Sequence, residues 1–147
     1  MADWAYSALS RLKSKEGAEH EANQDRALKR RQVVSDAPHL WSQVYAIFEE
    51  EIDTFSQLRP DYLQMVPLND GVVLASPDCE IQITFKPDTP RITYEAKTRP
   101  GRQPKGKGTY TFRVDNDDEA VWIVDENGNR LQPDIVAETI LDHLIEE

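Results

Sequence analysis

Alternation of apolar and polar residues between positions 81 and 114 is the feature that most constrains the fold of this chain. The apolar side chains occupy every second position in three stretches, which are Ile81, Ile83 and Phe85, then Ile92, Tyr94 and Ala96, and then Tyr110, Phe112 and Val114. The residues between them are mostly polar, so each stretch is expected to form a strand with one buried face and one solvent-exposed face. Strands of this kind favour an antiparallel meander.

Turn residues divide the region after Arg59-Pro60 into short strands. The dividing segments are Asn69-Asp70-Gly71, Pro77-Asp78, Pro87-Asp88-Thr89-Pro90 and Asn127-Gly128. Glycine, proline, asparagine and aspartate each favour turns. Their spacing predicts five or six strands, of which 121–124 is apolar on both sides and is expected to lie in the centre of the sheet or under another element.

Two amphipathic helices are expected to cover one face of this sheet. The first, residues 39–58, has a wide apolar face that includes Trp41, Val44, Phe48, Ile52 and Phe55. The second, residues 134–146, has a broad apolar stripe that includes Ile135, Val136, Ile140, Leu141, Leu144 and Ile145. The predicted fold class is therefore α+β, with an antiparallel five- to six-stranded meander packed on one face by two helices.

An N-terminal helical arm, residues 1–34, is expected to precede an α+β domain at residues 35–147. The apolar residues of the arm form a short stripe at helical spacing, which we name the N-terminal stripe and which consists of Trp4, Ala5, Ala8, Leu9 and Leu12. From Lys13 to Gln32 the apolar residues are alanines and Leu28, so little there can drive packing. The segment Ser35-Asp36-Ala37-Pro38 has the capping residue and early proline of a helix start, and it predicts that a new helix begins there.

The N-terminal stripe, and above all Trp4, Leu9 and Leu12, is a candidate surface for a protein partner or for self-association. At about 1.5 Å per helical residue, the arm could place the stripe on another subunit. The alternative is that the arm folds back and the stripe completes the core of its own chain. Both readings stay open at the level of sequence.

A basic segment, residues 97–108, interrupts an otherwise acidic body. The net charge of the chain is −10, with +2 over residues 1–34 and −12 over residues 35–147. The positive charges of Arg99, Arg102, Lys105 and Lys107, set among glycines, are of the kind that binds phosphate in nucleotides or nucleic acids. The segment lacks the spacing of a Walker loop and has no aromatic residue for base stacking. The alternative is a long, mobile hairpin loop that its charges keep in solution.

The common motifs of catalysis and metal binding are missing. His20, His39 and His143 do not have zinc-site spacing, and the carboxylates of residues 115–119 fit a solvated turn better than a calcium loop. No nucleophile elbow and no dinucleotide-binding turn occurs. We therefore expect no cofactor and no metal, and a protein that is not an enzyme, with an enzyme of unfamiliar site as an alternative.

The single cysteine, Cys79, alternates with Ile81 and Ile83, so a buried structural thiol is expected. A lone cysteine forms no internal disulfide, which favours a reducing compartment. No apolar run approaches the roughly 20 residues that cross a bilayer, and the first residues do not resemble a signal peptide. The sequence thus predicts a cytoplasmic, non-catalytic protein-binding or assembly module without membrane contact, and a nucleotide or nucleic-acid binder is the first alternative.

Overall fold

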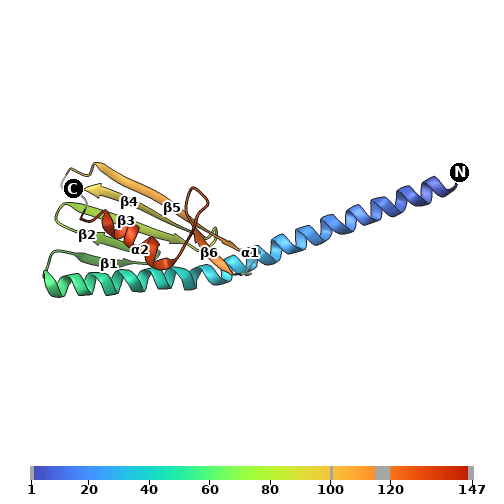
Figure 1. The fold of residues 1–147 in the computed structure, drawn as a ribbon. Helices are drawn as coiled ribbons and strands as arrows, with labels where there is room; N and C mark the ends of the chain where they lie inside the picture. The colour runs from blue at the N-terminus through green and yellow to red at the C-terminus, as the bar shows by residue number, and fades with distance from the viewer. Residues whose placement is uncertain (1, 100, 115–119, 146–147) are drawn as a thin grey trace. The chain divides into compact units, whose positions relative to one another are not determined.

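The computed structural model describes residues 2–99, 101–114 and 120–145, and for residues 2–3 and 20–22 it describes the backbone alone. The chain divides into two compact units, Met1–Gln32 and Val33–Glu147. A long helix, seven strands and a short helix follow one another along the chain (Figure 1). They are α1 (Ala2–Leu58), β1 (Gln64–Leu68), β2 (Gly71–Ala75), β3 (Cys79–Lys86), β4 (Arg91–Thr98), β5 (Pro104–Val114), β6 (Val121–Val124), β7 (Arg130–Leu131) and α2 (Pro133–Asp142).

The strands form one antiparallel sheet in the order β1-β2-β3-β4-β5-β6-β7, so each strand pairs with its neighbours along the chain. This confirms the predicted α+β class and the meander. The described strands number seven rather than five or six. The two outermost strands are the hardest to identify from alternation, because β1 is largely exposed and β7 is two residues long.

One face of the sheet, called here the inner face, carries the core. Ile81 lies opposite Ala96, and Ile83 lies opposite Tyr94, so the apolar sets of neighbouring strands share this face. The part of α1 that begins at Val33 and the whole of α2 cover it, as Figure 1 shows. Cys79 is fully buried there, as expected, and burial raises the pKa of its thiol while the charge of Lys105 acts in the opposite direction.

The prediction that a new helix begins at Ser35-Asp36-Ala37-Pro38 is wrong. A single helix, α1, runs through this segment, and Pro38 lies inside it. Ala37 is fully buried and Val33 packs against the core, so apolar contacts start before the proline and continue beyond it. These contacts offset the backbone hydrogen bond that Pro38 cannot donate, and its own side chain is exposed.

The C-terminal helix is shorter than the predicted 134–146. It ends at Asp142 with His143 as its C-cap, and residues 143–145 form turns. The carbonyl oxygens of His143 and Leu144 accept hydrogen bonds from other parts of the unit, as described below. These bonds satisfy the end of the helix in place of a further helical turn.

Candidate functional site

The N-terminal stripe lies on the first turns of α1, within the unit Met1–Gln32. The structure describes that unit as helical from residue 2 onward, which sets Trp4, Ala8 and Leu12 one above the other on one side of the helix. Trp4 is 73% exposed, Leu9 48% and Leu12 53%. The stripe is therefore a set of large apolar side chains in water.

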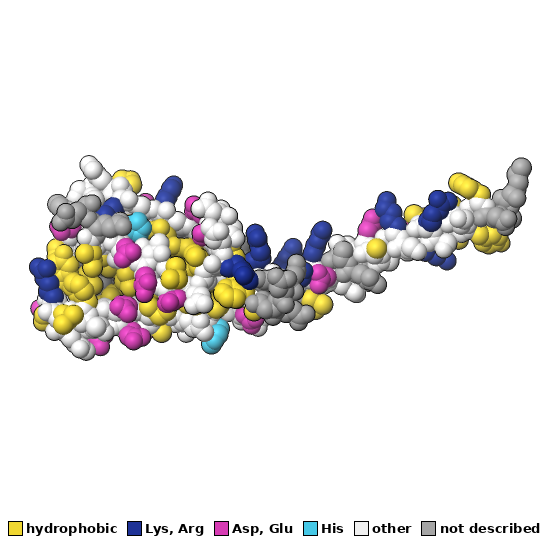
Figure 2. Space-filling model, viewed as in Figure 1, with side chains coloured by type: hydrophobic (Ala, Val, Ile, Leu, Met, Phe, Trp, Pro, Cys, Tyr) yellow, Lys and Arg dark blue, Asp and Glu magenta, His cyan; other side chains and the backbone are white. Residues whose placement is uncertain are grey.

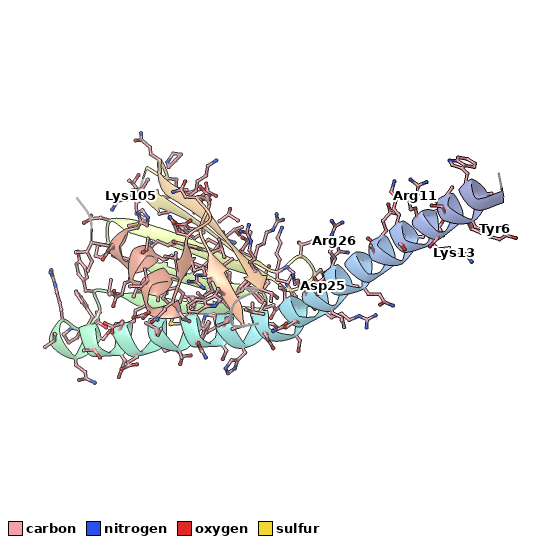
Figure 3. All side chains as sticks on the ribbon, turned by 45° about the vertical axis from the view of Figure 1, so that its right-hand side comes forward. Tyr6, Arg11, Lys13, Asp25, Arg26 and Lys105 are labelled. Carbon is pink, nitrogen blue, oxygen red and sulfur yellow. The ribbon has the colours of Figure 1, made fainter. Side chains whose placement is uncertain are left out.

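Two basic residues border the stripe. At about 100° per residue, Arg11 falls beside Trp4 at one edge of the stripe and Lys13 beside Leu9 at the other. Figure 3 shows the Arg11 and Lys13 side chains leaving α1 on different sides. Figure 2 shows the hydrophobic side chains of this part of the chain next to Lys and Arg. The surface is thus an apolar stripe with a positive charge on each side.

The four basic residues predicted to bind phosphate, Arg99, Arg102, Lys105 and Lys107, are distributed over different surroundings. β4 ends at Thr98 and β5 begins at Pro104, so Lys105 and Lys107 lie on a strand and the prediction of a long hairpin loop is wrong. The turn is tied to Thr98, which accepts a backbone hydrogen bond from Arg102 over 2.8 Å. Arg99 and Arg102 are exposed there.

Lys105 contacts the end of α2. A β-bulge opposite Ala96 and Lys97 shifts the register at this point of β5. The Lys105 Nζ donates a hydrogen bond of 2.7 Å to the carbonyl oxygen of His143. A cation at this position also complements the negative end of the helix dipole.

The glycines of the basic segment make room for aromatic rings. A Cβ atom at Gly106 would lie 2.9 Å from the His143 ring, and one at Gly108 would lie 2.5 Å from the Tyr94 ring. The Tyr94 and His143 rings also pack on each other, with their centroids 5.4 Å apart. The space beside these glycines, which the sequence suggested for phosphate, holds side chains of the chain itself.

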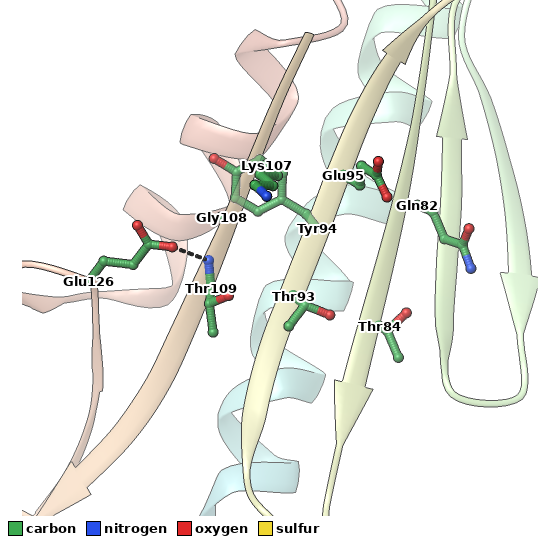
Figure 4. Close-up of a pocket in the computed structure, with 9 residues that line it drawn as sticks. All are labelled: Gln82, Thr84, Thr93, Tyr94, Glu95, Lys107, Gly108, Thr109 and Glu126. Atoms are coloured by element: carbon green, nitrogen blue, oxygen red, sulfur yellow. Dashed lines mark hydrogen bonds between the residues drawn. The ribbon is translucent and has the colours of Figure 1, made fainter. Parts of the chain in front are cut away.

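Lys107 borders a polar hollow of about 580 Å³ on the outer face of the sheet, and it lies opposite Glu95. Figure 4 shows this face, with Thr84, Thr93 and Thr109 on adjacent strands and the two helices behind them. The carboxylate of Glu126 accepts a hydrogen bond of 3.1 Å from the Thr109 backbone N–H. Threonine, glutamine and glutamate side chains supply most of the described lining, so the hollow offers many hydrogen-bonding groups.

Sequence reasoning missed a groove between α1 and α2. This groove has a volume of about 190 Å³ and a floor of apolar side chains, and Glu51, Glu138 and Asp142 also line it. The sequence does show acidic residues next to the apolar positions of the two predicted helices. Their convergence depends on how the helices pack, which the sequence pattern does not specify.

The predictions about metal binding fall partly outside the described residues. The carboxylates of 115–119 and the side chain of His20 lie outside them. His39 is exposed and shares a hydrogen bond of 3.1 Å with Gln43. Within the described ranges, no group of three or more His, Cys, Asp or Glu side chains is arranged to hold a metal ion.

The fold and these surfaces define an α+β protein with a long N-terminal helix, a described seven-stranded antiparallel meander and a short C-terminal helix. No family model, no curated protein and no solved structure matches the chain. Among the residues that the structure describes, no helix is long and apolar enough to cross a membrane.

Proposed function

We propose that this chain is a non-catalytic protein-binding or assembly module, and that the N-terminal stripe is its contact surface. The observation that carries the proposal is the exposure of Trp4, Leu9 and Leu12 on one face of a helix. Burial of such side chains contributes about 25 cal/mol per Å² of apolar surface removed from water. Tryptophan is enriched among the residues that dominate binding energy in protein interfaces.

The proposal includes a location in the cytoplasm. It is supported by the lone cysteine, Cys79, which is buried with a raised pKa and is therefore a structural thiol. The negative net charge of −10 favours basic or apolar partner surfaces over polyanions.

Cross-linking of the tagged full chain in its native cells tests the proposal. The informative variant is Trp4→Ala/Leu9→Ala/Leu12→Ala, in which alanine preserves helix propensity while the apolar contact is removed. The matched control is Leu28→Ala, since Leu28 is 62% exposed in the same unit but lies outside the stripe.

We expect a defined cross-linked protein, either a second copy or another chain identified by mass spectrometry, with the wild type and with Leu28→Ala. The triple variant should lose it. A cross-linked product that is equally abundant with the triple variant would contradict the proposal, as would the absence of any product from the wild type.

Binding of a nucleotide or nucleic acid through Arg99, Arg102, Lys105 and Lys107 is the less supported alternative. Lys105 is engaged with His143, and Lys107 lies beside Glu95 on the outer face of the sheet. Arg99 and Arg102 alone share one exposed turn. Salt-dependent binding of single-stranded RNA or DNA that disappears in Arg99→Ala/Arg102→Ala would favour this alternative over the first.

A further inference from the structure

We propose that the groove between α1 and α2 binds the N-terminal stripe of a second copy of this chain. The inference rests on the proposed function and names the partner. Ile52 and Phe55 of α1 and Leu141 of α2 line the groove, together with Ile145, which is 56% exposed. Figure 2 shows hydrophobic side chains with Asp and Glu among them over the region where α1 and α2 lie in Figure 1.

The size of the groove fits side chains better than a small molecule. Its volume of about 190 Å³ lies below the roughly 300–1,000 Å³ of pockets that enclose small-molecule ligands. Large apolar anchors on an amphipathic helix, spaced by three or four residues, are the usual occupants of such helix-lined grooves. In the stripe, Trp4, Ala8 and Leu12 are spaced by four residues, and Leu9 precedes Leu12 by three.

The charges around the groove are complementary to those around the stripe. Glu51 borders it on the α1 side, and Glu138 and Asp142, four residues apart on α2, border it on the other. Among the described residues, none of these three carboxylates is in a salt bridge and no lysine or arginine lines the groove. The groove therefore has negative charge on both helices.

The stripe offers one positive charge at each of its edges, in Arg11 and Lys13. A helix that lays the stripe into the groove can bring one of these side chains toward Glu51 and the other toward the α2 carboxylates. This two-sided match of charge adds specificity to an apolar contact. The association should weaken as salt rises, because exposed ion pairs are screened.

A second copy is the occupant proposed here because each copy carries both of the complementary surfaces. The stripe of one copy offers the apolar and basic side chains that match the groove of another. The resulting contact joins two different surfaces. Two copies that bind each other reciprocally form a closed dimer, whereas copies that do not bind reciprocally form an open chain of subunits.

Mixing two variants of the full chain tests the inference. The first, Trp4→Ala/Leu12→Ala, lacks the stripe but retains the groove. The second, Ile145→Lys, retains the stripe but places a cation in the groove at an exposed position, where the substitution should not disturb the core. Light scattering over a range of protein concentrations gives the molar mass of each variant and of the mixture, and Leu28→Ala is the control.

We expect the mass of the wild type and of Leu28→Ala to rise with concentration, with at least tenfold weaker self-association in each of the two variants alone. Their mixture should form a one-to-one heterodimer, since one variant supplies the stripe and the other the groove. Arg11→Glu/Lys13→Glu and Glu51→Lys/Glu138→Lys should likewise associate with each other more strongly than either does with the wild type.

Two results would overturn the inference, and each is distinguishable from failure of the proposed function. If Ile145→Lys and Glu51→Lys/Glu138→Lys associate like the wild type while the stripe variant does not, copies associate through the stripe without the groove, and the proposed function stands. If the wild type is monomeric at every concentration, the second copy is not the partner. The proposed function then depends on the cross-linking result alone.

Discussion

The Nζ of Lys105 on β5 donates a hydrogen bond of 2.7 Å to the carbonyl oxygen of His143, at the residue where α2 ends. From the turn between β2 and β3, the hydroxyl of Ser76 donates one of 3.1 Å to the carbonyl oxygen of Leu144. Two strand regions far apart in the sequence therefore hold the same end of α2 against the sheet. This arrangement explains why the helix stops at Asp142 although the apolar stripe continues beyond it.

Lys105→Met should lower the free energy of unfolding by about 1 kcal/mol, because it removes a charge-assisted hydrogen bond while preserving much of the apolar stem. Urea denaturation followed by circular dichroism measures the change. The matched control is Lys107→Met, two residues along the same strand on the outer face, which should change stability by less than about 0.5 kcal/mol. Equal losses in the two variants would show that the bond to His143 has no special contribution.

Gly108→Ala should destabilise the protein by about 1–3 kcal/mol, since the new methyl group must displace the Tyr94 ring from its place beside β5. A Cβ atom at Gly108 would lie 2.5 Å from Tyr94 Cε1, whereas one at Gly101 would meet nothing nearer than 4.0 Å. Gly101→Ala is thus the control in the same thermal or urea denaturation. A neutral effect of Gly108→Ala would mean that the ring moves aside at no cost.

The thiol of Cys79 should react slowly with thiol reagents in the native protein. It is fully buried, burial raises its pKa, and the hydroxyl of Ser76 accepts a hydrogen bond of 3.2 Å from its backbone N–H. Ser76→Ala removes this bond and the bond to Leu144, so labelling should become at least tenfold faster under native conditions. The exposed Ser42→Ala is the control, and an unchanged rate in Ser76→Ala would contradict the prediction.

The stability of the protein should fall between about pH 10 and pH 12 in a way that depends on Tyr110. Burial raises the pKa of Tyr110 to about 12 from its ordinary value of 10.0, and Tyr94 and Asp125 act in the same direction. In this window the unfolded chain has lost the phenolic proton while the folded chain keeps it, so the free energy of unfolding decreases as pH rises. Below about pH 10 the contribution is complete.

Comparison with Tyr110→Phe isolates this effect, because phenylalanine fills nearly the same space without a titratable group. Urea denaturation at several alkaline pH values should give a shallower loss of stability in the variant than in the wild type. Parallel curves for the two proteins would show that other groups account for the alkaline loss.

The sequence predicted those parts of the fold in which a single local pattern determines the outcome. Alternation at Ile81, Ile83 and Phe85 specifies both a strand and its buried face, since a shift of one residue would expose the whole set. The turn residues located the hairpins for a similar reason. Alternation alone does not mark β1 and β7, because an edge strand needs no alternation and a two-residue strand is too short to show any.

Tertiary contacts overrode local signals at two places. Pro38 reads as a helix start, yet contacts of Val33 and Ala37 with the core carry α1 across it. The glycines at 106 and 108 read as loop residues, but they lie on a strand beneath the rings of His143 and Tyr94. In each case the residues whose contacts determine the local structure are distant in sequence, so the local sequence pattern does not reveal them.

The two candidate surfaces also differ in whether the sequence could predict them. The N-terminal stripe was visible in the sequence because its residues follow one helical period, and its contribution to binding stays a prediction. The groove was not visible, because Glu51 and Glu138 are 87 positions apart in the sequence and meet only through the packing of α1 beside α2. A local pattern cannot specify a surface of this kind.

The uncrossed order of the sheet has a consequence for how the chain folds during synthesis. Each described strand after β1 pairs with the strand made just before it, so every pairing joins neighbours along the chain. The helical residues from Val33 to Leu58 precede all the strands and can receive their apolar side chains in turn. We expect the sheet to grow by one strand at a time as the ribosome delivers it, with α2 closing the structure last.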